Sequence, residues 1–308
     1  MLALLITALP LQAQTPPSTT PDDPPNTTVP DPPNTDPGTA PGTDPGNPPG
    51  DALPSQLINI STRGPVQTGD NVMIAGFVIE GSSEKTVLIR VLGPSLAASN
   101  VPDPLQDPFV QLFEGSTLLT SNDDFADTAN ANTFLGGPLE PSNPKESVIV
   151  ATLDPGEYTA IVRGVGETTG NALVEVFDQS TNGAELINIS TRGPVETGDS
   201  VMIAGFVIEG GQSQRVLIRA VGPSLAGQGV PGSMSDPFIQ LFEGSTLLES
   251  NDNFGDSPNL ALFQGGTLEP GNANEPVIVR ELDPGEYTAI VRGVGETTGV
   301  ALVEVFDF

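Results

Sequence analysis

Two short clusters of acidic and amide side chains are the residues of this chain best suited to chemistry. Each follows a Phe-Glu-Gly-Ser segment, and they read SNDDFAD (Ser121–Asp127) and SNDNFGD (Ser250–Asp256). Ca²⁺ prefers six to eight hard oxygen ligands, which Asp and Asn side chains on a loop supply together with backbone carbonyls. The candidate Ca²⁺ ligands are Asn122, Asp123, Asp124, Asp127, Asn251, Asp252, Asn253 and Asp256.

The spacing within these clusters differs from that of an EF-hand loop, because the central Gly and the distal Glu of that motif are missing. Asp124 becomes Asn253 in the second cluster, which keeps an oxygen ligand and loses a charge. The alternative interpretation is a pair of loops built from Asx turns, with Phe125 and Phe254 filling the core. The residues alone leave both interpretations open.

The clusters recur because most of the chain consists of two copies of one sequence repeat. Residues 57–178 (the first copy) and 186–307 (the second copy) align without a gap at an offset of 129 residues, with about 70% of positions identical. Such self-similarity identifies the folding unit before any secondary structure is assigned. It also restricts the candidate chemistry, since a residue present in only one copy cannot serve a function common to both.

The composition excludes several classes of function. Lys and Arg total 10 against 39 Asp and Glu, giving a formal net charge of -29. We therefore expect no nucleic-acid partner, because binding phosphates requires Lys and Arg. The chain has no Cys and no His, which removes disulfides, thiolate chemistry and the commonest general base. It also lacks Trp, the usual platform of sugar-processing sites, so a hydrolase based on paired carboxylates is the least favoured class.

Three arginine positions persist in both copies, and in so acidic a chain we expect each to pair with a carboxylate. Arg90 lies within the apolar run VLIRVLG, so its partner should be partly buried. Breaking a buried pair from one side is costly. The arginine pairs are Arg63 and Arg192, Arg90 and Arg219, and Arg163 and Arg292. The candidate partners are Asp70, Asp107, Glu175, Asp199, Asp236 and Glu304.

Two glycine-containing motifs resemble catalytic or phosphate-binding loops only superficially. Gly164–Gly170 (GVGETTG) lacks the Lys and the following helix of a phosphate loop, so we interpret it as a hairpin connection. The Gly-Pro-Ser-Leu motif at Gly93–Leu96 is interpreted as a turn, because no His or matched Lys is present to activate Ser95 or Ser224.

The N-terminal region is expected to direct secretion and to form a spacer, rather than to be part of a folded domain. Residues 1–14 (MLALLITALPLQAQ) are typical of the apolar and cleavage regions of a signal peptide, with cleavage near Ala13. The charged leading region is missing, which is consistent with a start further upstream. The alternative is a buried strand. Residues 15–54 are rich in Pro, Thr, Asp and Gly, so we expect a disordered stalk. A seven-residue linker, 179–185, joins the copies and should restrict their relative orientation.

Short apolar runs separated by turn residues predict an all-β fold. Val, Ile, Leu, Phe and Thr dominate these runs, as strands prefer. In the first copy we expect strands at Leu57–Thr62, Val72–Glu80, Thr86–Leu92, Phe109–Glu114, Thr117–Thr120, Ser147–Leu153, Glu157–Arg163 and Ala172–Phe177. In the second copy we expect them at Leu186–Thr191, Val201–Glu209, Arg215–Val221, Phe238–Glu243, Val277–Leu282, Glu286–Arg292 and Ala301–Phe306.

Eight or so short strands per copy predict two tandem antiparallel β-sandwich domains of jelly-roll-like type, at 55–178 and 186–308. Within the first, the order Asp154-Pro155-Gly156-Glu157 favours a type II turn in which Gly156 takes a positive φ. Residues Asn130–Leu135 are compatible with one short helical turn.

The segment Leu282–Asp307 (LDPGEYTAIVRGVGETTGVALVEVFD) resembles the closing hairpin of bacterial pre-peptidase C-terminal (PPC) domains. The runs INISTRGPV, TGD, VMIAGFVIEG, VLIR and GPSL also resemble a repeated module of large secreted bacterial proteins. The first resemblance implies a β-sandwich accessory to secreted enzymes, in a group where related sandwiches bind Ca²⁺ and matrix polymers. No enzyme domain accompanies the modules in this chain.

These observations lead to one functional hypothesis and its alternatives. We expect a non-catalytic secreted or cell-surface structural or adhesive protein, whose partner is an extracellular matrix or surface polymer or another copy of itself. In a variant of this hypothesis, a retained N-terminal segment donates a strand to a neighbour and builds a filament. The alternative is a Ca²⁺-dependent binder of an extracellular polysaccharide or protein. No cofactor other than Ca²⁺ is expected.

Overall fold

The computed structural model describes residues 55–180 and 184–308. The expected signal peptide at 1–14, the expected stalk at 15–54 and three residues of the linker (181–183) lie outside these ranges.

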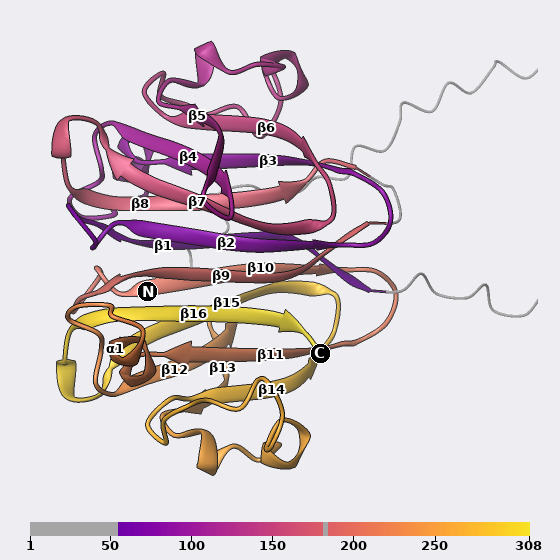
Figure 1. Cartoon of the computed structure of the whole chain (residues 1–308), viewed down its shortest axis with the longest axis vertical. Helices are drawn as coiled ribbons and strands as arrows, with labels where there is room; N and C mark the ends of the chain where they lie inside the picture. Colours follow the sequence, from indigo (N-terminus) through magenta and orange to yellow (C-terminus); the bar gives the residue numbers. More distant parts are fainter. Residues whose placement is uncertain (1–54, 181–183) are drawn as a thin grey trace, which may run out of the picture.

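Each copy folds as an antiparallel sandwich of two four-stranded layers, which confirms the predicted fold class (Figure 1). In the first copy one layer has the strand order β1-β8-β3-β6 and the other has β2-β7-β4-β5. This is the order of a jelly roll, in which successive strands alternate between the layers except for the hairpin of β4 and β5. The strands are β1 (Gln56–Val66), β2 (Met73–Glu80), β3 (Lys85–Leu92), β4 (Pro108–Glu114), β5 (Thr117–Asn122), β6 (Ser147–Leu153), β7 (Gly156–Gly164) and β8 (Gly170–Asp178).

The second copy repeats this arrangement strand for strand, with β10-β15-β12-β13 in one layer and β9-β16-β11-β14 in the other. Its strands are β9 (Glu185–Val195), β10 (Met202–Glu209), β11 (Gln214–Val221), β12 (Pro237–Glu243), β13 (Thr246–Asn251), β14 (Val277–Leu282), β15 (Gly285–Gly293) and β16 (Gly299–Asp307). In residues 55–180 and 184–308, helical structure is limited to segments of three to six residues, such as α1 (Pro223–Gly227) and the 3₁₀ turn at Ala131–Thr133 inside the expected helical segment.

The turn before β7 differs from the prediction, because Gly156 is not among the residues with positive φ. It is already the first residue of β7, where it pairs with Ile79 of β2, so its backbone is extended. The chain reversal is instead closed by Tyr158, whose hydroxyl donates to the Asp154 carbonyl at 2.8 Å. Tyr287 makes the same bond to the Asp283 carbonyl in the second copy, at 2.7 Å.

The two copies join edge to edge into continuous sheets. Strand β1 pairs with β10 of the second copy, and β9 pairs with β2 of the first. Each layer therefore becomes one eight-stranded antiparallel sheet. Figure 1 shows β1 and β2 of the first copy lying next to β9 and β10 of the second at the centre of the molecule. Backbone groups that would otherwise lie on open sheet edges are thereby paired.

One apolar core runs through both copies. The largest cluster of buried side chains includes residues of β1, β2 and β7 together with their counterparts in β9, β10 and β15. Within it Phe77 stacks on Tyr158 with ring centroids 5.5 Å apart, and Phe206 stacks on Tyr287 at the same distance. Since packed apolar contacts continue across the junction, unfolding one copy exposes core surface of the other.

A pair of buried threonines lies where the two copies meet. The hydroxyl oxygens of Thr62 and Thr191 are 2.8 Å apart and hydrogen-bonded, and both side chains are buried. We expect Thr62→Val to lower the free energy of unfolding by about 1–3 kcal/mol, because the Thr191 hydroxyl loses its partner inside the core. The double variant Thr62→Val/Thr191→Val should lie close to wild type. Urea unfolding measures all three, and a double variant as costly as the sum of its singles would contradict this role.

Candidate functional site

The acid-amide clusters begin where the outer strands β5 and β13 end. Asn122 is the last residue of β5, and Asn251 is the last residue of β13. A single 3₁₀ turn follows in each case, at Phe125–Asp127 and Phe254–Asp256. Because β5 and β13 are the outermost strands of their sheets, the clusters lie at the two outer ends of the double sandwich, away from the junction of the copies.

Asn122 and Asn251 have a structural role within these clusters, because their side chains hydrogen-bond to backbone groups. The amide oxygen of Asn122 accepts a hydrogen bond from the backbone N–H of Val148 at 2.8 Å, and its amide nitrogen donates to the Asp124 carbonyl at 2.8 Å. Asn251 accepts from Val277 in the same way, at 2.9 Å. Both side chains are buried. Each asparagine thus ties its loop to the edge strand beside it, β6 or β14.

The acidic members of the clusters are more exposed than the asparagines. Asp123 accepts a hydrogen bond from the Asp124 N–H at 3.1 Å, which forms a local turn, and Asp127 is exposed. Within residues 55–180 and 184–308, no three Asp, Glu, His or Cys side chains are grouped so as to hold a metal ion. The rings of Phe125 and Phe134 pack edge to face at 6.2 Å beneath the first loop. These contacts fit the turn interpretation, and Ca²⁺ binding stays a prediction.

A buried glutamate in each copy was not among the candidates expected from the sequence. Glu146 is fully buried, and one of its oxygens accepts hydrogen bonds from the backbone N–H groups of Gly93 and Ser95, both at 3.0 Å, and from the Ser95 hydroxyl at 2.5 Å. Glu275 makes the corresponding bonds to Gly222 and Ser224. The Gly-Pro-Ser motif is thus a turn wrapped around a carboxylate, as charge-assisted bonds of this kind favour.

A signal for this glutamate was present in the sequence. The residues on either side of Glu146 differ between the copies, with Lys145 and Ser147 replaced by Asn274 and Pro276, whereas the glutamate persists. An acidic residue kept between changed neighbours indicates a specific contact.

The structure selects Glu175 as the partner of Arg90. An Arg90 nitrogen lies 2.6 Å from a Glu175 oxygen, and the guanidinium also donates to the Leu139 carbonyl at 3.1 Å and stacks over the Phe177 ring. Burial raises the pKa of Glu175 above its ordinary value, and Arg90 opposes that rise. The second copy repeats the arrangement with Arg219 and Glu304.

The prediction that each arginine meets a carboxylate is wrong for Arg163. Its guanidinium donates to the side-chain oxygen of Gln111 at 2.7 Å, because Gln111 lies on the neighbouring strand β4. Arg63 reaches across to the second copy and donates to the backbone carbonyl of Asp199 at 3.2 Å. Asp107, another candidate, pairs with Lys145 at 2.5 Å.

One buried ion pair exists in the first copy alone. Lys85 is almost fully buried and pairs with Asp178. At the equivalent positions of the second copy, the Gln214 amide donates to Asp307. Burial, with a smaller contribution from the Glu185 carboxylate, raises the pKa of Asp307 above its ordinary value.

This difference between the copies gives a test by titration. We expect Gln214→Lys to lower the pKa of Asp307, because an ammonium stabilises the carboxylate more than an amide does. In wild type the raised pKa means that the charged form costs stability at neutral pH, and that this cost disappears as the pH falls below the unfolded-state pKa. NMR titration of the Asp307 carboxyl in both proteins measures the change, and an unchanged pKa would show that the new ammonium does not reach it.

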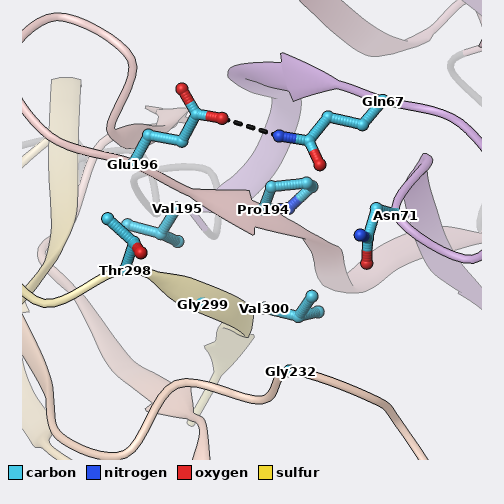
Figure 2. Close-up of a pocket in the computed structure, with 9 residues that line it drawn as sticks. All are labelled: Gln67, Asn71, Pro194, Val195, Glu196, Gly232, Thr298, Gly299 and Val300. Carbon is cyan, nitrogen blue, oxygen red and sulfur yellow. Dashed lines mark hydrogen bonds between the residues drawn. The ribbon is translucent and has the colours of Figure 1, made fainter.

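A small cavity of about 160 Å³ lies at the junction of the copies (Figure 2). Its lining residues are Gln67, Asn71, Pro194, Val195, Glu196, Gly232, Thr298, Gly299 and Val300. Across it the Gln67 amide donates to the Glu196 carboxylate at 2.6 Å. On the other side of the junction, Asn171 occupies the position of Val300 and donates to Ser200 at 3.3 Å and to the Pro102 carbonyl at 2.8 Å. The cavity therefore marks a place where the two copies differ.

Comparisons with known proteins leave the functional question open. No family model matches the chain, and no curated protein matches it in sequence. Among solved structures, a DUF4785 family protein from Legionella pneumophila is similar at 12% identity, with a TM-score of 0.22, over 81% of this chain and 62% of that one. A structure of PNGF-II is similar at 10% identity, with a TM-score of 0.17, over 82% of this chain and 59% of that one. The chain thus spans about three fifths of each of those proteins.

The helices of the described part of the chain are all too short, or too polar, to cross a membrane.

Proposed function

We propose that this chain is a non-catalytic structural or adhesive module of a secreted or cell-surface protein. The observation that supports it most is the continuity of both eight-stranded sheets across the two copies. Because backbone pairing and one core continue across the junction, the two copies keep a fixed orientation relative to each other. Such an arrangement suits a spacer or scaffold that presents its surface at a fixed position.

The roles of the persistent polar residues support the same proposal. Glu146, Asn122 and Arg90 each make several hydrogen bonds that hold a turn or an outer loop in place. Their counterparts in the second copy do the same. Residues that would otherwise be candidates for acid-base chemistry or ion binding are thus engaged in maintaining the fold.

Secretion and the PPC-like character belong to this proposal as well. The apolar segment at 1–14 and the Pro-rich segment at 15–54 would export the module and hold it away from its attachment point. Its partner would then be an extracellular matrix polymer, a surface polymer or another copy of the chain.

Co-sedimentation and turnover assays test the proposal together. The full chain is mixed with insoluble cellulose, chitin or peptidoglycan, in Ca²⁺ or in EDTA, and released products are measured in parallel with soluble oligosaccharide and peptide substrates. We expect the chain to sediment with a polymer or with itself to the same extent in both buffers, without product release. Turnover that is lost on substitution of one carboxylate would overturn the proposal in favour of a hydrolase.

A further inference from the structure

The contacts between the copies have the form of a twofold symmetric interface. Thr62 meets Thr191 and Gln67 meets Glu196, and in both pairs the partners are 129 residues apart, which is the offset of the two copies. Each pair therefore joins one position of the repeat to the same position in the other copy. Contacts of a position with itself occur at a twofold axis, where one patch binds an identical patch.

The strand pairing obeys the same symmetry. Thr62 of β1 is opposite Ala204 of β10, and Thr191 of β9 is opposite Ala75 of β2. Each of the two junctions also contains one register shift. It lies between Leu57 and Asn59 where β1 pairs with β10, and between Val78 and Ile79 where β2 pairs with β9, which is the equivalent place. The two junctions are thus one interface made twice.

A copy without its partner would present β1 and β2 as open edges on the same side of its sandwich. Both edges border the core, where Leu57, Phe77 and Ile79 are buried. A partner must therefore offer two edge strands at the spacing of the two layers, and must add apolar side chains between them. The structure shows that a second copy of the repeat does this.

We propose that β1 and β2 form a self-complementary docking surface, whose partner is a second copy of this repeat and whose assembly does not require the linker. Repeats carried on separate chains then pair as the two copies do here. The proposal rests on the interface geometry and stands independently of the proposed function.

The differences between the copies give the docking surface a preference. In the observed pair the Gln67 amide donates to Glu196, whereas two second copies would place two Glu196 carboxylates against each other. Like charges at close distance disfavour such a pair. Two first copies would instead place two Gln67 amides together, which can hydrogen-bond. First copies should thus accept either kind of partner, and second copies should select first copies.

Cutting the linker tests the docking surface in the otherwise intact protein. A recognition site for a specific protease is inserted within residues 181–183, and the folded full chain is cut and examined by native mass spectrometry at micromolar concentration. We expect the two halves to remain together at the mass of the uncut chain. When differently isotope-labelled cut samples are mixed, we expect hybrids that contain one first and one second copy. Separation of the halves on cutting would overturn the proposal.

A cross-link in the cut protein provides a second measurement with a covalent readout. The chain has no cysteine, so Thr62→Cys/Thr191→Cys introduces one pair, at positions whose hydroxyl oxygens are 2.8 Å apart. After cutting and then oxidation, the halves should migrate together without reductant and separately with it. The single variant Thr62→Cys should give no cross-link within a chain. Absence of the cross-link in a folded double variant would also overturn the proposal.

Discussion

Replacing Arg90 with Met is expected to lower the free energy of unfolding by about 3–5 kcal/mol. The substitution keeps most of the aliphatic part of the side chain but leaves Glu175 buried without its cation. It also removes the hydrogen bond to the Leu139 carbonyl and the contact with the Phe177 ring. Urea unfolding at neutral pH measures the loss. The loss should shrink at low pH, because protonation of Glu175 removes the unpaired charge.

Two further variants separate burial from simple loss of an ion pair. Arg215 and Glu281 form an equally short contact, at 2.6 Å, with both side chains well exposed, so Arg215→Met should cost no more than about 1 kcal/mol. The double variant Arg90→Met/Glu175→Leu should recover most of the loss, because it leaves no unpaired charge. Equal costs for Arg90→Met and Arg215→Met would contradict a burial effect.

Replacing Lys85 with Met is the second substitution with a large expected effect, again about 3–5 kcal/mol. It leaves the mostly buried Asp178 carboxylate without its ammonium partner. The second copy supplies the matched control, because Gln214 fills the same position and donates to Asp307. Lys85→Gln should therefore cost clearly less than Lys85→Met. Similar losses for the two variants in urea unfolding would show that the contribution of Lys85 lies in its aliphatic packing rather than in its charge.

The strands and their assembly into jelly rolls could be predicted from the sequence because their information is local. Runs such as Met73–Glu80 and Gly156–Gly164 combine strand-forming residues with turn residues at their ends. The predicted bounds differ from the observed ones by a few residues, for example at β5, which continues to Asn122.

The joining of the copies could not be predicted, since nothing local distinguishes an edge strand from a central one here. Strand β1 pairs with β8 of its own copy on one side and with β10 on the other, so it is paired on both sides like an interior strand. The shortness of the linker indicated a restricted orientation and did not indicate which edges meet. That choice depends on long-range pairing.

The candidate site shows the same limit at the level of single residues. The persistence of Asn122 in both copies was visible, but an amide that binds a metal ion and an amide that accepts a backbone N–H look identical in sequence. The contact of Glu146 with the Gly-Pro-Ser turn, about fifty residues earlier in the chain, likewise exists only after the strands are in place. For Arg90, a buried position predicted a carboxylate partner, and the cross-strand register selected Glu175.

Differential scanning calorimetry of the full chain tests the central claim, that the two copies form one cooperative unit, most directly. Continuous sheets and a shared core predict a single transition whose van't Hoff enthalpy equals its calorimetric enthalpy. At about 0.7 kcal/mol per residue near 60 °C, roughly 250 folded residues give about 180 kcal/mol. Two transitions, or a van't Hoff enthalpy near half the calorimetric value, would mean that the copies unfold independently and would contradict the claim.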